Sequence, residues 1–235
     1  MAFPRSMIRP VLTLVFSILS ACGAAGGGAR TPETCGTPPA LAAAEREASE
    51  AYRLALADDF PPLAARLSDL EENWRDARRR VEADGAPPEA VSAAGDAVVA
   101  LRWAATERDS SAAVARAANR ASRAMRELSM FYRPDTPARL FDLNVLDREL
   151  VLDGMTSDFA SAAQHIASLE AAWSAVRTRL VGATDDAAIS AFDASVRALR
   201  EALDASDGGR LSRIADRGRE LAASFEVVLT CGSGA

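Results

Sequence analysis

The only histidine in the chain, His165, is the first residue to consider for chemistry, and its isolation excludes several kinds of site. Di-iron helical bundles need two Glu-x-x-His motifs, and covalent haem attachment needs Cys-x-x-Cys-His. Neither pattern occurs in this sequence. A Ser-His-Asp or Cys-His nucleophile system would have to use His165 as its base. We interpret His165 instead as a solvated flank position beside Ile166, with a role as ligand or base as the alternative. We expect no catalytic residue, no metal and no cofactor.

Charged residues that recur at a fixed spacing are the next candidates. Glu71 and Arg78 lie seven residues apart, on one face of a helix, and Glu170 and Arg177 repeat the arrangement. General acid–base chemistry by two carboxylates requires a shared cleft, and the surrounding sequence indicates none. We therefore predict that these residues form ion pairs between helices or helix caps, and that the protein is not an enzyme.

An internal duplication accounts for the recurrence. Three segments of the first half align without gaps with three of the second half, at shifts of 99, 98 and 97 residues: 59–81 with 158–180, 91–102 with 189–200, and 114–120 with 211–217. The register changes by one residue at each intervening loop, where insertions and deletions are tolerated. We assign the two copies to residues 35–134 and 135–231.

Apolar residues in both copies follow one another at steps of three and four, as in Phe60, Leu63, Leu67, Leu70 and Trp74. This spacing places one apolar stripe along a helix, and no comparable segment alternates with period two. The two stripe tryptophans, Trp74 and Trp173, are predicted core residues. Because short loops make successive helices antiparallel, the sequence predicts an all-α fold of eight antiparallel helices in two tandem four-helix repeats.

Trp103 and Val99 do not follow the stripe of their own helix and are predicted to lie on its opposite face. Their counterparts in the second copy are the charged residues Glu201 and Arg197. An outward apolar patch indicates a contact surface. The favoured contact is the other four-helix unit, and the alternative is a partner protein or a ligand.

The amino terminus has the features of a targeting signal. An apolar run over residues 11–21 follows Arg5 and Arg9, and it is too short to span a bilayer but has the form of a secretory signal. Its last residues and the next, Leu19-Ser20-Ala21-Cys22, resemble the lipobox of bacterial lipoproteins. The resemblance implies removal of residues 1–21 and acylation of Cys22, which would anchor the chain stably to a membrane. An ordinary cleaved signal with an incidental cysteine is the alternative.

Within that family, Gly23 in place of aspartate favours the outer membrane of a Gram-negative bacterium, facing the periplasm. Residues 22–34 then form a flexible tether of Gly, Ala and polar residues, and residues 232–235 form a short tail. Cys35 and Cys231 remain near the two ends of the body and are predicted to form a disulfide, since an even number of antiparallel helices returns both ends to one side. Two free thiols or a metal pair are the alternative.

The charge of the chain limits its partners. Removal of two signal-peptide arginines changes the formal net charge from −6 to −8, which does not suit general binding to nucleic acid. The sequence therefore favours a lipid-anchored envelope protein that acts as a binding or scaffolding module, with the membrane and an envelope protein as partners. The alternative is a carrier that holds a small ligand in a pocket between the two repeats.

Overall fold

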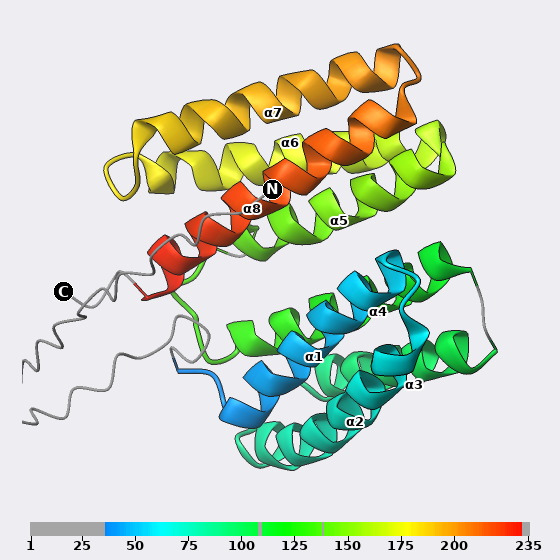
Figure 1. Cartoon of the computed structure of the whole chain (residues 1–235). Helices are drawn as coiled ribbons and strands as arrows, with labels where there is room; N and C mark the ends of the chain where they lie inside the picture. Colours follow the sequence, from blue (N-terminus) through cyan, green and yellow to red (C-terminus); the bar gives the residue numbers. More distant parts are fainter. Residues whose placement is uncertain (1–35, 108–109, 138, 232–235) are drawn as a thin grey trace, which may run out of the picture.

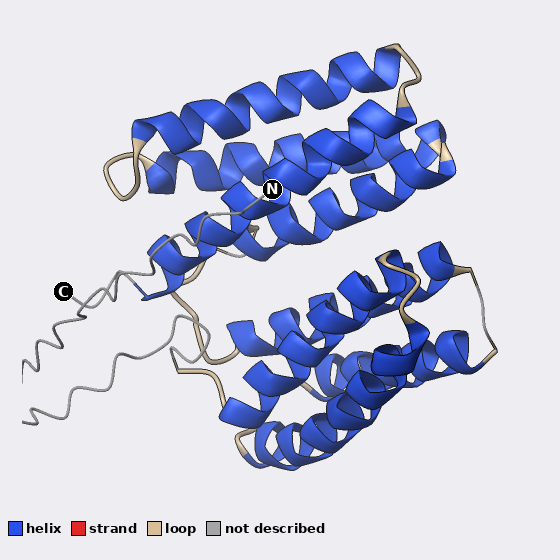
Figure 2. Cartoon of the chain, viewed as in Figure 1, coloured by secondary structure: helices blue, strands red, loops and turns tan. Residues whose placement is uncertain are grey.

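The computed structural model describes residues 36–107, 110–137 and 139–231, and this part of the chain contains eight helices and no strand (Figures 1 and 2). The all-α prediction is confirmed. The helices are α1 (Pro39–Leu56), α2 (Phe60–Ala83), α3 (Pro88–Thr106), α4 (Ser111–Met130), α5 (Leu140–Thr156), α6 (Phe159–Leu180), α7 (Asp186–Asp204) and α8 (Gly208–Cys231).

The helices form two groups of four, here called the first unit (α1–α4) and the second unit (α5–α8) (Figure 1). In the first unit α1 and α3 each pack against both α2 and α4, and in the second unit α5 and α7 each pack against both α6 and α8. The backbones of the two units approach each other where α4 packs against α5. The duplication itself stays a sequence-based prediction. If it is correct, corresponding helices of the two units are expected to pack against each other in the same way.

Local sequence explains where the helices begin. The Ser110 hydroxyl accepts a hydrogen bond from the Ala113 amide at 3.2 Å, and Asp158 accepts one from the Ser161 amide at 3.1 Å. Such caps satisfy amides that the first helical turn leaves free. Asp59, the counterpart of Asp158, makes no side-chain cap, because the residue three positions on is Pro62, which has no N–H to donate.

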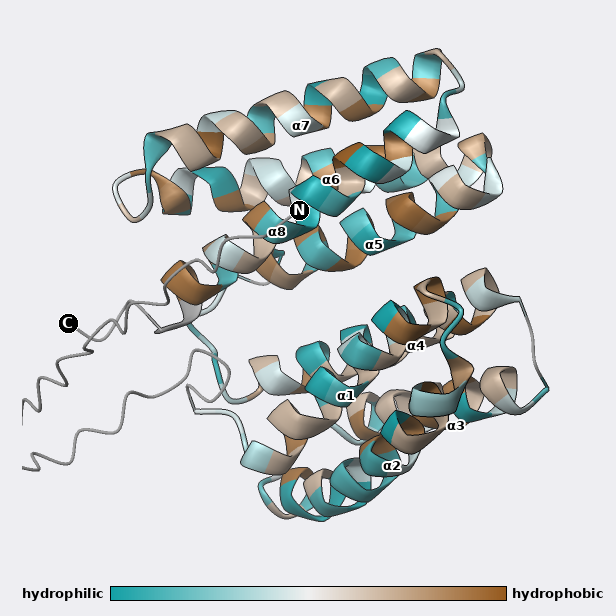
Figure 3. Ribbon diagram, viewed as in Figure 1, coloured by the Kyte–Doolittle hydropathy of each residue, from teal (hydrophilic) through white to brown (hydrophobic). Residues whose placement is uncertain are grey.

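The apolar stripes form a core in each unit. Figure 3 shows hydrophobic and hydrophilic residues interspersed along every helix. Both stripe tryptophans, Trp74 and Trp173, are buried as predicted. In the second unit Trp173 lies 4.5 Å from Phe192 and 5.5 Å from Phe225 between ring centroids, which forms an aromatic cluster. Contacts of this kind stabilise a core beyond the area that they bury.

Helix α5 is buried on more than one face, which the sequence did not indicate. It packs against α4 of the first unit and against α6 and α8 of its own, and its buried residues include polar ones: Asn144, Asp147, Arg148 and Asp153. The approach to α8 is close, because a Cβ atom on Gly154 would lie 2.5 Å from the carbonyl oxygen of Gly208. Only glycine permits this spacing.

Several predictions concern residues outside the described part of the chain. These are the signal peptide, the lipobox with Cys22, the tether, Cys35 and the tail. Cys231 is the last residue of α8, and its side chain is not described, so the pairing of Cys35 with Cys231 stays a prediction. Among the described helices, none has a stretch long and apolar enough to cross a bilayer.

Candidate binding site

Val99 and Trp103 lie on the outward face of α3, with 69% and 61% of their surfaces exposed. They are one residue or two away from Val98 and Leu101, which are buried in the core. Helix α3 packs only against α2 and α4 among the described helices. The expectation that this patch contacts the other four-helix unit is therefore wrong, and the patch faces outward from the molecule.

A groove runs between α2 and α3 beside this patch, with a volume of about 780 Å³. Trp74, Arg75 and Arg78 line it from α2, and Gly95 and Val99 line it from α3. Because Val99 belongs to both, the apolar patch and the groove form one continuous surface, here called the α2/α3 site.

The ion pair between Glu71 and Arg102 crosses from α2 to α3 at one end of this groove. The Arg102 guanidinium donates to both Glu71 carboxylate oxygens, at 2.6 and 2.7 Å. A second hollow of about 710 Å³ lies beyond the pair, with Phe60 and Leu67 among its lining residues. In the second unit Arg200 makes the equivalent pair with Glu170, so the prediction of ion pairs between helices is confirmed for both glutamates.

In the second unit, side chains occupy the position between α6 and α7 that is equivalent to the groove of the first unit. There the Trp173 indole Nε1 donates to Asp193 at 2.7 Å, and Arg177 Nη2 lies 3.0 Å from the same carboxylate. The hydrogen bonds from Arg177 lower the pKa of Asp193 below its ordinary value. Asp193 is therefore an ionised carboxylate held by an indole N–H and a guanidinium.

The first unit has the two donors without the carboxylate. Trp74 and Arg78 are the counterparts of Trp173 and Arg177, and Gly95 is the counterpart of Asp193. A Cβ atom on Gly95 would lie 3.6 Å from Trp74 Nε1, so the structure places Gly95 where Asp193 stands in the other unit. Trp74 is 93% buried, and its Nε1 has no hydrogen-bond partner among the described residues.

Side-chain size explains why the groove is open. The first unit has Ala94 and Gly95 where the second has Phe192 and Asp193. Ala94 is fully buried in the core and does not line the groove, so the position that opens it is Gly95, which has no side chain where Asp193 has a carboxylate. The alignment of the two copies contains this difference, but it points to the groove only once the contact between Trp173 and Asp193 is known.

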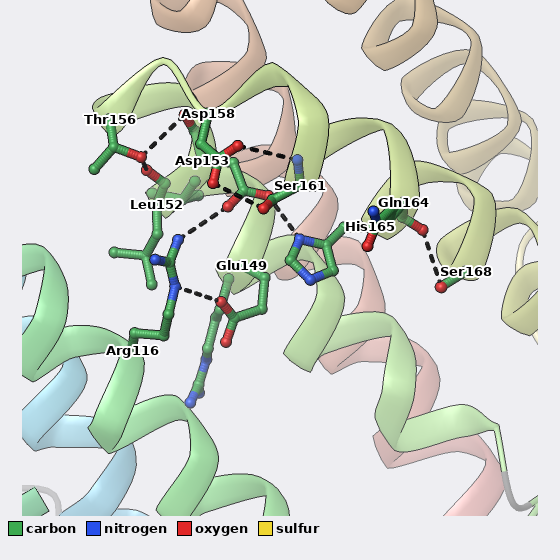
Figure 4. Close-up of polar contacts among 12 residues, drawn as sticks. Arg116, Glu149, Leu152, Asp153, Thr156, Asp158, Ser161, Gln164, His165 and Ser168 are labelled. Carbon is green, nitrogen blue, oxygen red and sulfur yellow. Dashed lines mark hydrogen bonds and ion pairs between the residues drawn. The ribbon is translucent and has the colours of Figure 1, made fainter.

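A second group of polar residues lies at the junction of the two units (Figure 4). Asp153 is fully buried, and its carboxylate lies 2.9 Å from Arg116 Nη2 and 2.6 Å from His165 Nδ1. Arg116 comes from α4 and also contacts Glu149 on α5, at 3.1 Å. The interpretation of His165 as a solvated flank position is wrong, because the ring is half-buried and its Nδ1 is hydrogen-bonded to Asp153.

We expect His165→Gln to lower the free energy of unfolding by about 1 kcal/mol at acidic pH, the scale of one hydrogen bond. The hydrogen bond to Asp153 raises the pKa of His165 above its ordinary 6.5, so the folded state holds the proton more tightly than the unfolded state. The contribution is complete below pH 6.5 and is lost as the pH rises through the raised pKa. Urea unfolding of both proteins between about pH 5 and about pH 9 measures it, and a difference that stays constant over this range would contradict the assignment.

Arg126 on α4 links the units a second time. Its Nε lies 2.9 Å from Glu45 on α1 and its Nη1 lies 2.5 Å from Glu226 on α8. Burial alone would raise the pKa of Glu45, but Arg126 and Arg148 lower that pKa to about 2. Burial raises the pKa of Glu226 in spite of Arg126. The junction is therefore packed with charged side chains.

Asp147 on α5 is buried without compensation. Both of its carboxyl oxygens lack a hydrogen-bond partner within the described residues, and burial raises its pKa well above the ordinary value. The carboxyl group faces Gly218 of α8, where a Cβ atom would lie 2.9 Å from either oxygen. Burial therefore disfavours the charged form of Asp147 at the α5–α8 contact.

Within the described ranges, no group of three or more His, Cys, Asp or Glu side chains is arranged to hold a metal ion. No family model, no curated protein and no solved structure matches this chain. The α2/α3 site is therefore characterised by its own geometry alone.

Proposed function

We propose that this protein is a lipid-anchored binding module of the bacterial cell envelope, and that it performs no catalysis. The observation that carries the binding role is the outward apolar patch of Val99 and Trp103 beside the α2/α3 groove. Tryptophan is enriched among the residues that dominate binding energy at protein interfaces. The second unit has Arg197 and Glu201 at the equivalent positions, so the patch is specific to one half of the body.

The lipobox residues and the Gly-rich segment after them support the anchored location. They would leave the helical body tethered at the envelope surface, most simply on the periplasmic side of the outer membrane. The carrier with a pocket between the repeats is not part of this proposal, because charged side chains occupy the junction and the α2/α3 groove lies within the first unit.

Photo-crosslinking in living cells tests the binding role. A photoreactive phenylalanine analogue at position 99 is expected to crosslink one defined envelope partner, and the same analogue at position 197 is the matched control on the second unit. Trp103→Glu, which copies the second unit, is expected to reduce the crosslink at least about tenfold, since loss of a central tryptophan costs about 2 kcal/mol. Trp103→Phe is expected to keep most of it.

Equal crosslinking from positions 99 and 197 would contradict the proposal, as would an unchanged crosslink in Trp103→Glu. Circular dichroism of each variant checks that the helices are intact. Because Trp103 is exposed, its replacement is expected to leave the fold unchanged.

A further inference from the structure

We propose that the α2/α3 groove binds the carboxylate group of a small organic acid, with Trp74 Nε1 and Arg78 as the donors. This inference rests on the proposed binding function and names the chemistry of one ligand for it. The second unit shows the bound arrangement, because Asp193 supplies from within the chain the carboxylate that the first unit lacks.

The donor that points to a ligand is the Trp74 indole. Trp74 Nε1 is not one of the fully buried polar atoms that lack a partner, so its N–H opens onto the groove, where the oxygen of a ligand can reach it. Trp74 Nε1 lines the groove beside the empty position at Gly95. A carboxylate oxygen at the place of the Asp193 oxygen would satisfy it at the 2.7 Å that Trp173 shows.

Arg78 can turn toward the same ligand at a small cost in free energy. It is now paired with Glu82 on its own helix, at 2.7 Å, and both side chains are about half exposed. Exposed pairs at this spacing contribute only about 0.3–0.5 kcal/mol, so the guanidinium can exchange Glu82 for a ligand. In the second unit the residue equivalent to Glu82 is Val181, and Arg177 contacts Asp193 instead.

The rest of the groove favours an acid with an apolar body. Val91, Val98 and Val99 line it on the α3 side, and Arg75 adds a second positive charge from α2. Asp96 also lines it and repels an anion, while the carboxylate of Glu71 is neutralised by Arg102. We therefore expect modest affinity, with a dissociation constant on the order of 1 mM for a ligand of about ten heavy atoms.

The three tryptophans of the chain provide the measurement. The full-length protein, labelled with 15N-tryptophan, gives one indole N–H signal each for Trp74, Trp103 and Trp173, assigned through the Phe variants. Phenylacetate is the probe, and phenylacetamide is its neutral analogue of the same shape. We expect phenylacetate to move the Trp74 signal in a saturable manner, to leave the Trp173 signal in place, and to bind at least tenfold more tightly than phenylacetamide.

Gly95→Asp gives the first unit the internal carboxylate of the second. It is expected to move the Trp74 signal toward that of Trp173 without ligand and to abolish the response to phenylacetate. Gly95→Ala is the matched control, because its Cβ atom would make only ordinary contacts, and it is expected to bind the acid like the original chain. Arg78→Gln on the exposed face is expected to weaken binding at least tenfold, and Asp96→Asn to strengthen it.

An unmoved Trp74 signal at saturating phenylacetate would overturn the carboxylate site. Equal binding of phenylacetate and phenylacetamide would also overturn it, as would undiminished binding of phenylacetate by both single variants, Gly95→Asp and Arg78→Gln. The proposed function fails by a different result, which is loss of position-specific crosslinking at residue 99. Trp103→Glu is expected to remove the partner and keep the response to phenylacetate, so the two failures are distinguishable.

Discussion

Replacement of Arg126 by methionine is expected to lower the free energy of unfolding by about 2–4 kcal/mol, because it removes the positive charge that two largely buried carboxylates share. The guanidinium lies between the carboxylates of Glu45 and Glu226, and its side chain is only 13% exposed. Methionine keeps the length of the stem but leaves two acidic groups facing each other. The loss is measured by urea unfolding at neutral pH.

Arg123→Met is the matched control on the same helix. Arg123 pairs with Glu127 on the surface of α4 and lies 3.9 Å from Asp142 on α5. Its side chain is about half exposed, so loss of these pairs is expected to cost no more than about 1 kcal/mol. Addition of Glu226→Gln to Arg126→Met is expected to restore part of the stability, since it removes the repulsion between the Glu45 and Glu226 carboxylates. Equal stability of the Arg126 and Arg123 variants would show that the units are not held together by this cluster.

Replacement of Cys22 by serine is expected to move the protein from the membrane fraction to the soluble fraction. Diacylglycerol and a further acyl chain contribute about 0.8 kcal/mol for each buried methylene group, so that acylated Cys22 would account for nearly all of the membrane affinity. Fractionation followed by immunoblotting measures the change. Cys35→Ser, thirteen residues further on, is the matched control and is expected to stay with the membrane.

Mass spectrometry of the mature protein gives the independent measurement, because an unprocessed serine variant can keep its apolar leader. The expected first residue is Cys22 with its lipid attached. A mature chain that begins at another residue, or that begins at Cys22 without lipid, would contradict the anchor while leaving the α2/α3 site unaffected.

The helices could be predicted from the sequence because their apolar residues are periodic. The stripes that contain Trp74 and Trp173 predicted one buried face on each of these helices, and both tryptophans are in the core. The outward position of Trp103 followed from the same periodicity. Helix ends were predictable where a polar residue precedes the first turn, as Ser110 does before α4.

The polar junction could not be predicted in this way. Asp153, Arg116 and His165 come from three helices, and periodicity within one helix says nothing about which polar residues of two units meet. The buried faces of helix α5 carry Asp147 and Arg148. Sequence analysis assigns charged residues such as these to the solvent-exposed face of a helix. For the same reason His165 was assigned to solvent.

The α2/α3 groove was only partly predictable. Trp103 and Val99 were identified because they contrast with Glu201 and Arg197 in the other copy. The equally informative contrast of Gly95 with Asp193 becomes meaningful only when the contact between Trp173 and Asp193 is known. A glycine indicates a binding site when the residue at the equivalent position of the other repeat shows which hydrogen-bond donors are left without an acceptor.

A crystal structure of the full chain with phenylacetate is the most direct test of the claim that the first unit receives from outside the carboxylate that the second unit supplies itself. The account predicts carboxylate density between Trp74 Nε1 and the Arg78 guanidinium, with Arg78 turned away from Glu82. Phenylacetate bound elsewhere, or a groove without ligand in which Arg78 keeps its contact with Glu82, would contradict it.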